Sequence, residues 1–84
     1  MSPWVLFVGN SCPNCDAMKT FLKENDISIS DTRNIQEDPQ ARVFMLTNRI
    51  SASVPTLYNR SSGEKIIGFT EDSKQNILQA FNKL

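Results

Sequence analysis

Cys12 and Cys15 are the residues of this chain whose types and spacing most directly suggest chemistry. They are its only cysteines and stand in the order Cys12-Pro13-Asn14-Cys15. Two thiols separated by two residues can close a small disulfide ring, and opening that ring is a two-electron reaction. The pair follows the apolar run Trp4–Val8 and precedes a helical pattern. At a helix N-terminus, free backbone N–H groups and the helix dipole favour thiolate over thiol. The spacing therefore predicts a redox-active pair.

The residues that the chain lacks narrow the alternatives. There is no histidine among the 84 residues, which excludes Cys-His and Ser-His catalysis and histidine metal ligation. A purely structural disulfide remains possible, but so short a ring constrains little of the unfolded chain. Zinc would need ligands beyond the two thiolates, from carboxylates or a second chain. We therefore expect no bound metal.

The bulk composition indicates a small soluble domain. Nine basic and nine acidic residues cancel, so net charge provides no attraction to nucleic acid or an anionic membrane. No run approaches the roughly 18 apolar residues of a membrane span, and the first residues lack the basic start of a signal peptide. We expect one domain over residues 1–84, a cytoplasmic monomer that binds neither nucleic acid nor membrane.

Hydrophobic periodicity predicts four strands and three helices. The expected strands are 4–8, 27–30, 54–58 and 65–69, and the expected helices run from residue 13 to the Asn25-Asp26 stop, from 39 to about 49, and from a cap at Thr70 or Asp72 to the end. The order is β-α-β-α-β-β-α. The first unit must be a right-handed parallel crossover and the last two strands a hairpin. The predicted fold class is α/β, with a four-stranded mixed sheet flanked by helices on both faces.

Apolar stripes predict which sides of the first and last helices are buried. These stripes are Ala17, Met18, Phe21 and Leu22 in the first helix, and Ile77, Leu78, Phe81 and Leu84 in the last. Arg42 and Arg49, on the second helix, could face a substrate carboxylate, although a solvated face is the simpler interpretation.

Three segments in this order resemble glutaredoxins and glutaredoxin-like redoxins of the thioredoxin-fold superfamily. They are Cys12-Pro13-Asn14-Cys15, Ser53-Val54-Pro55 at the start of the third strand, and Gly68-Phe69-Thr70-Glu71-Asp72 between the last strand and helix. The resemblance extends over nearly the whole chain. It implies a thioredoxin fold and a dithiol thiol–disulfide oxidoreductase that reduces protein disulfides or glutathione mixed disulfides.

The resemblance also implies roles for individual residues. Cys12 would attack the substrate disulfide and Cys15 would resolve the mixed disulfide. Pro55 would follow a cis peptide bond, so that Val54 pairs with an extended substrate segment. Gly68 would allow close approach of that ligand. The N–H groups after Thr70 would hold the γ-glutamyl carboxylate of glutathione, in a site formed by Thr70, Glu71 and Asp72. Glutathione would then be a co-substrate, with no tightly bound cofactor.

Two departures from the glutaredoxin pattern leave the reductant open. Gly9-Asn10-Ser11 stands where many glutaredoxins have a lysine before the first cysteine, and Phe69 replaces a second glycine. Gly-Phe at this point is similar to glutaredoxin-like proteins that are reduced by thioredoxin reductase and donate electrons to ribonucleotide reductase. Phe69 is equally compatible with a substrate contact and a core position. A non-catalytic alternative is an iron–sulfur cluster bridging two chains through Cys12 and glutathione, as some glutaredoxins have.

Overall fold

The computed structural model describes residues 2–84 and contains the predicted β-α-β-α-β-β-α order. Its elements are β1 (Trp4–Val8), α1 (Pro13–Glu24), β2 (Asp31–Asn34), α2 (Pro39–Thr47), β3 (Thr56–Asn59), β4 (Lys65–Ile67) and α3 (Glu71–Ala80). No helix within residues 2–84 is long and apolar enough to cross a membrane.

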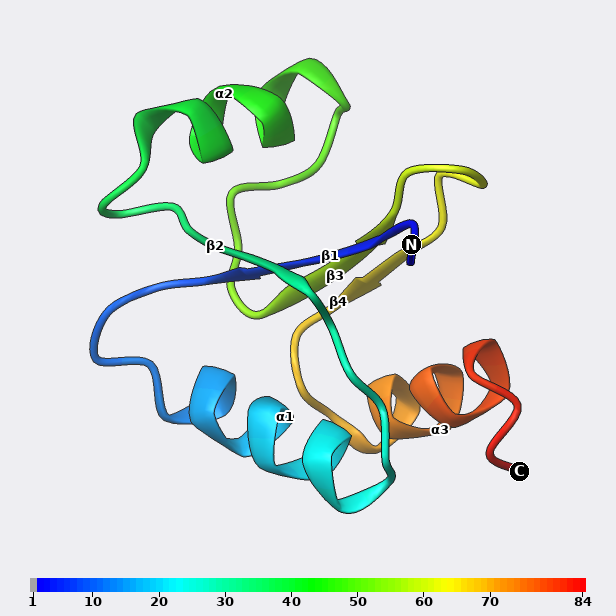
Figure 1. Cartoon of the computed structure of the whole chain (residues 1–84). Coiled ribbons are helices and arrows are strands. Elements are labelled where there is room, and N and C mark those ends of the chain that lie inside the picture. The colour runs from blue at the N-terminus through cyan, green and yellow to red at the C-terminus, as the bar shows by residue number, and fades with distance from the viewer. Residues whose placement is uncertain (1) are drawn as a thin grey trace.

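The strands form one mixed sheet in the order β2-β1-β3-β4. β1 runs parallel to β2 and antiparallel to β3, and β3 and β4 form the expected hairpin. Figure 1 shows α2 on one face of the sheet and α1 with α3 on the other. The predicted α/β fold class is confirmed.

The central strand β1 is buried on both faces because helices cover both sides of the sheet. Trp4, Leu6 and Val8 belong to the core that includes buried residues of α1 and α3. Val5 and Phe7 belong to the core beneath α2. A continuous apolar strand is what such a position requires, and it delivers the chain to the start of α1.

The position predicted for the second strand was wrong. Residues 27–30 form no strand, and β2 begins at Asp31. Ile27 instead closes the end of α1, where its N–H donates to the carbonyl oxygen of Leu22 at 2.9 Å. Ile29 packs against the same core. The alternating apolar residues therefore cover α1 and connect it to the sheet, while the strand itself is polar.

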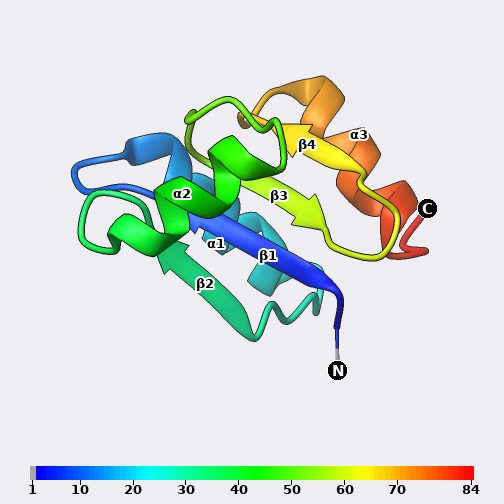
Figure 2. The same ribbon diagram turned by 90° about the horizontal axis from the view of Figure 1, so that it is seen from above.

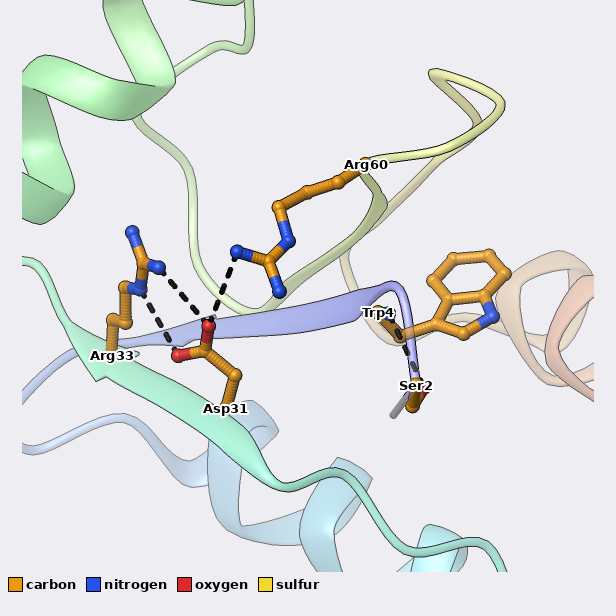
Figure 3. Close-up of polar contacts among 5 residues, drawn as sticks. All are labelled: Ser2, Trp4, Asp31, Arg33 and Arg60. Carbon is orange, nitrogen blue, oxygen red and sulfur yellow. Dashed lines mark hydrogen bonds and ion pairs between the residues drawn. The ribbon is translucent and has the colours of Figure 1, made fainter.

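Charge pairing replaces apolar patterning in β2, as Figure 3 shows. Arg33 donates two hydrogen bonds of 3.0 Å to the Asp31 carboxylate, and Arg60 from the β3–β4 turn lies 3.8 Å from it. The hydrogen bonds from Arg33, with the charges of Arg33 and Arg60, hold the pKa of Asp31 below its ordinary value. In the same view, the N–H of Trp4 donates to the Ser2 hydroxyl.

Other boundaries also differ from the predictions. β3 begins at Thr56 rather than residue 54, because Val54 belongs to the segment that approaches the cysteines. Ala17 is exposed, and Leu84 is 71% exposed because α3 ends at Ala80. Of the two caps proposed for the last helix, Thr70 is the one observed.

Candidate active site

The cysteine pair lies where β1 delivers the chain to the first turn of α1. Cys12 is the N-cap of α1 and Pro13 is its first helical residue. The backbone N–H of Cys15 donates to Sγ of Cys12 at 3.1 Å. Proline fits the first position because its missing N–H would have no partner there. The helix thus directs a main-chain donor and its positive dipole end at the sulfur of Cys12.

The two sulfurs differ in exposure. Cys12 is partly exposed, whereas Cys15 is 1% exposed and belongs to the core between the sheet and α1. The structure holds the pair as a disulfide, with the two Cα atoms 5.2 Å apart. Cys12 is therefore the more accessible of the two sulfurs, and Cys15 is the buried one.

A cavity of about 580 Å³ opens beside Cys12. Its walls include Cys12, Pro13, Asn14, Gln36, Arg42 and Val54. Arg42 is exposed and brings a guanidinium from α2 to the edge of the cavity. The sequence favoured a solvated face for Arg42. The tertiary fold shows that this turn of α2 borders the cysteine loop, and no local sequence signal indicates this.

The segment Ser53-Val54-Pro55 reaches the cavity wall through Val54. The Val54–Pro55 peptide bond is cis, as the resemblance implies. Val54 lines the cavity and Pro55 is buried, whereas Ser53 is exposed. The Ser53 carbonyl oxygen accepts a 2.8 Å hydrogen bond from the Thr56 hydroxyl, which fixes the segment to the start of β3.

The segment Gly68–Asp72 is attached to this wall but does not line the cavity. The N–H of Gly68, whose φ is 80°, donates to the carbonyl oxygen of Pro55 at 2.8 Å. The Thr70 hydroxyl caps α3 by accepting from the N–H of Ser73, and Glu71 and Asp72 are exposed in the first turn. The structure thus joins this segment to the cysteine region through Pro55.

Phe69 packs against α1. Its ring is partly buried and meets the ring of Phe21 edge-on, with 5.7 Å between centroids. The ammonium group of Lys74 lies over the Phe69 ring, 5.2 Å from its centroid. Of the two roles left open by the sequence, these contacts favour the core position.

Sequence reasoning missed a group of amides that ties the cysteine loop to the loop before α2. Asn34 donates to the side-chain oxygen of Asn10 at 2.9 Å, and the Asn10 N–H donates to the side-chain oxygen of Gln36. Gly9 lies close to these side chains. A Cβ atom on Gly9 would come within 2.8 Å of the side-chain oxygen of Gln36 and 3.2 Å of Val54. The local sequence shows only a break after β1, so the pairing of these distant residues carries no sequence signal.

Residues 2–84 contain no group of three or more Cys, Asp or Glu side chains placed to hold one metal ion.

The fold and the site define a thioredoxin-fold protein with a Cys-x-x-Cys pair at the start of its first helix. A model of the glutaredoxin family matches residues 4–62, and the chain belongs to that family. Its pair supports a thiol–disulfide redox role.

Solved structures agree with this assignment. The chain is similar to a mutant of the thioredoxin-like protein BC3987, with 27% identity, a TM-score of 0.82 and all of both chains covered. It is also similar to the crystal structure of BC3987 itself, with 29% identity and a TM-score of 0.72 over 89% of this chain and 99% of the other. A comparison with curated protein sequences found no significant match.

Proposed function

We propose that this protein is a dithiol thiol–disulfide oxidoreductase that reduces protein disulfides or glutathione mixed disulfides. The Cys12 thiolate attacks one sulfur of the substrate disulfide, and the other substrate sulfur leaves as a thiolate. Cys15 then attacks Sγ of Cys12, which releases the remaining substrate thiol and leaves the Cys12–Cys15 disulfide. Two electrons pass from the pair to the substrate, and an external thiol or a reductase restores them.

The observation that carries this proposal is the asymmetry of the pair. Cys12 is partly exposed and accepts a main-chain hydrogen bond at the N-terminus of α1, whereas Cys15 is buried within bonding distance of it. Attack on an external disulfide requires a reachable thiolate, and resolution requires a second thiol that the substrate cannot reach first. The burial of Cys15 therefore supports its role as the resolving thiol.

The cavity supports an extended substrate segment. Val54 stands beside Cys12 with its main chain outside the β3 ladder, so a substrate strand could pair with it as in other strand-addition complexes. We assign Pro13, Asn14, Ser53, Val54 and Pro55 to this contact.

Glutathione is the proposed co-substrate or reductant, and it would bind at the segment Gly68–Asp72. The N–H groups at the start of α3 and the close link from Gly68 to Pro55 favour a carboxylate ligand near the cysteines. Phe69 stands where many glutaredoxins have a second glycine, which favours thioredoxin reductase as an alternative reductant.

A disulfide-reduction assay on three proteins tests the proposal. The wild type is expected to reduce a low-molecular-weight disulfide catalytically. Cys12→Ser is expected to lose this activity, and Cys15→Ser is expected to accumulate a mixed disulfide at Cys12 that mass spectrometry detects. Full activity of Cys12→Ser would disprove the assignment.

The reductant is tested separately. The oxidised protein is supplied either with glutathione, glutathione reductase and NADPH, or with thioredoxin reductase and NADPH, and NADPH consumption is followed. Turnover in the first system alone supports a glutaredoxin cycle. Turnover in the second alone supports the role of an electron donor recycled by thioredoxin reductase, as for donors to ribonucleotide reductase.

A further inference from the structure

The outer face of α2 carries two exposed apolar side chains that the redox chemistry leaves unexplained. Val43 and Leu46 are 53% and 64% exposed, although both are large apolar residues. Ala41 and Met45 of the same helix are fully buried against the sheet. The fold therefore does not need Val43 and Leu46, because α2 already packs through its other side.

Cations border this apolar face. Arg42 is followed four residues later by Leu46, a spacing that brings neighbours together on a helix, and Arg49 lies just beyond the end of α2, after its cap Asn48. Neither arginine forms an ion pair with another residue in the described range 2–84. Lys65 of β4 adds a third cation at this end, since its ammonium group donates to the carbonyl oxygen of Arg49 at 3.1 Å.

No carboxylate within the helix offsets these charges. The sequence of α2 contains no Asp or Glu. Asp38, immediately before it, accepts a 3.0 Å hydrogen bond from the N–H of Gln40 and so caps the helix. A chain with no net charge thus has basic side chains, and no carboxylate from α2 itself, around two exposed apolar side chains.

This face of α2 is continuous with the redox site. Arg42 lines the cavity that contains Cys12, and it also lines a smaller cavity of about 390 Å³ together with Gln36 and Pro39. In Figure 2, α2 lies alone in front of the sheet, so its outward side is open to a partner. Arg42 thus connects the cavity at Cys12 with the exposed face of α2, which a partner bound at Cys12 could also contact.

We infer that the outer face of α2, formed by Arg42, Val43 and Leu46 and bordered by Arg49 just beyond the helix end, docks protein substrates whose disulfide is flanked by acidic and apolar residues. This inference rests on the proposed function and adds a substrate class to it. The exposed apolar pair would bury surface against the partner, and the arginines would attract its carboxylates and orient its disulfide toward Cys12. Selection between substrates is therefore expected to depend on charge.

Two symmetrical peptide disulfides test the inference. Each half has a Leu-Cys-Leu centre, flanked by glutamates in one peptide and by lysines in the other. The wild type is expected to reduce the acidic peptide with a kcat/KM about threefold to tenfold higher at low ionic strength. Raising the salt to about 0.5 M is expected to bring the ratio close to one, because the Debye length becomes shorter than the separation of the charges.

Matched variants separate this face from general surface effects. Arg49→Glu is expected to abolish the preference for the acidic peptide, and Leu46→Asp to lower its kcat/KM about threefold or more by repulsion and loss of apolar contact. Lys83→Glu and Leu84→Asp make the same changes at exposed positions beyond α3, and they are expected to leave the ratio unchanged.

The neutral disulfide of 2-mercaptoethanol distinguishes the two proposals. All five proteins are expected to reduce it at the same rate, because it has no charge for α2 to recognise. Failure of the wild type to reduce it would refute the proposed function itself. Equal rates on the two peptides, or control variants that change the ratio as much as Arg49→Glu does, would overturn only the docking inference. A dimer that Leu46→Asp dissociates would also overturn it, by assigning the face to a second copy.

Discussion

Replacing Asp31 with asparagine tests how the polar edge strand β2 is held in the sheet. Asp31 accepts two 3.0 Å hydrogen bonds from Arg33 and lies 3.8 Å from Arg60, and these side chains are 27–40% exposed. Exposed ion pairs contribute about 0.2–1 kcal/mol, and charged hydrogen bonds more. Asparagine keeps one acceptor oxygen, so we expect a loss of about 1 kcal/mol in the free energy of unfolding at pH 7. For a chain of this size, that lowers Tm by about 4–8 °C.

The effect of Asp31→Asn should depend on pH in a defined direction. The pKa of Asp31 is lowered in the folded protein, so the unfolded chain takes up its proton first as the pH falls. The stabilisation is therefore fully present above the unfolded pKa, about 3.9, and disappears as the pH drops through the lower folded value. The difference between wild type and variant is expected to be constant from pH 7 to about 5 and to shrink below about 4.

Urea unfolding measures this difference. Trp4 is the only tryptophan and is 5% exposed, so its fluorescence reports the transition. Glu24→Gln is a matched control, because Glu24 is exposed and has no ion-pair partner among residues 2–84. An Asp31→Asn protein as stable as wild type at pH 7, or a difference that persists unchanged to pH 3, would refute the reasoning.

Three further predictions concern the core and the last helix. Thr70→Ala removes the cap of α3 and is expected to cost about 1 kcal/mol of unfolding free energy in urea titration, with Thr70→Ser restoring it. Ile77→Ala empties a fully buried position between α3 and the sheet, and is expected to cost about 2–5 kcal/mol in the same assay; a value below 1 kcal/mol would contradict the packing. Phe69→Ala is expected to lower Tm through loss of the Phe21 contact, whereas the alkylation rate of Cys12 stays unchanged; the reverse pattern would make Phe69 a site residue.

The parts of the fold that follow from local sequence signals were predictable. A continuous apolar run marks β1 as a central strand, and proline after Cys12 marks the start of α1. Asp38 before Pro39 marks the start of α2 in the same way. These signals lie within a few residues of the elements that they define, so local sequence is enough to place the two cysteines between β1 and α1.

The parts that depend on distant pairing were not predictable. β2 has no apolar alternation, because Arg60 and the ladder to β1 hold its polar residues in place. Arg42 reaches the cavity only because α2 crosses the sheet near the cysteine loop. Likewise, Asn10 and Gln36 meet across 26 positions of sequence, and neither residue type indicates such a partner.

The pH dependence of Cys12 alkylation tests the central claim most directly. Reduced protein is treated with iodoacetamide across pH 4–10, and the modification of each cysteine is followed by mass spectrometry. A helix N-terminus that favours the thiolate predicts a rate midpoint for Cys12 well below the value of about 8.5 for an ordinary thiol, with the buried Cys15 reacting much more slowly. A Cys12 midpoint at or above 8.5, or faster modification of Cys15, would contradict the account.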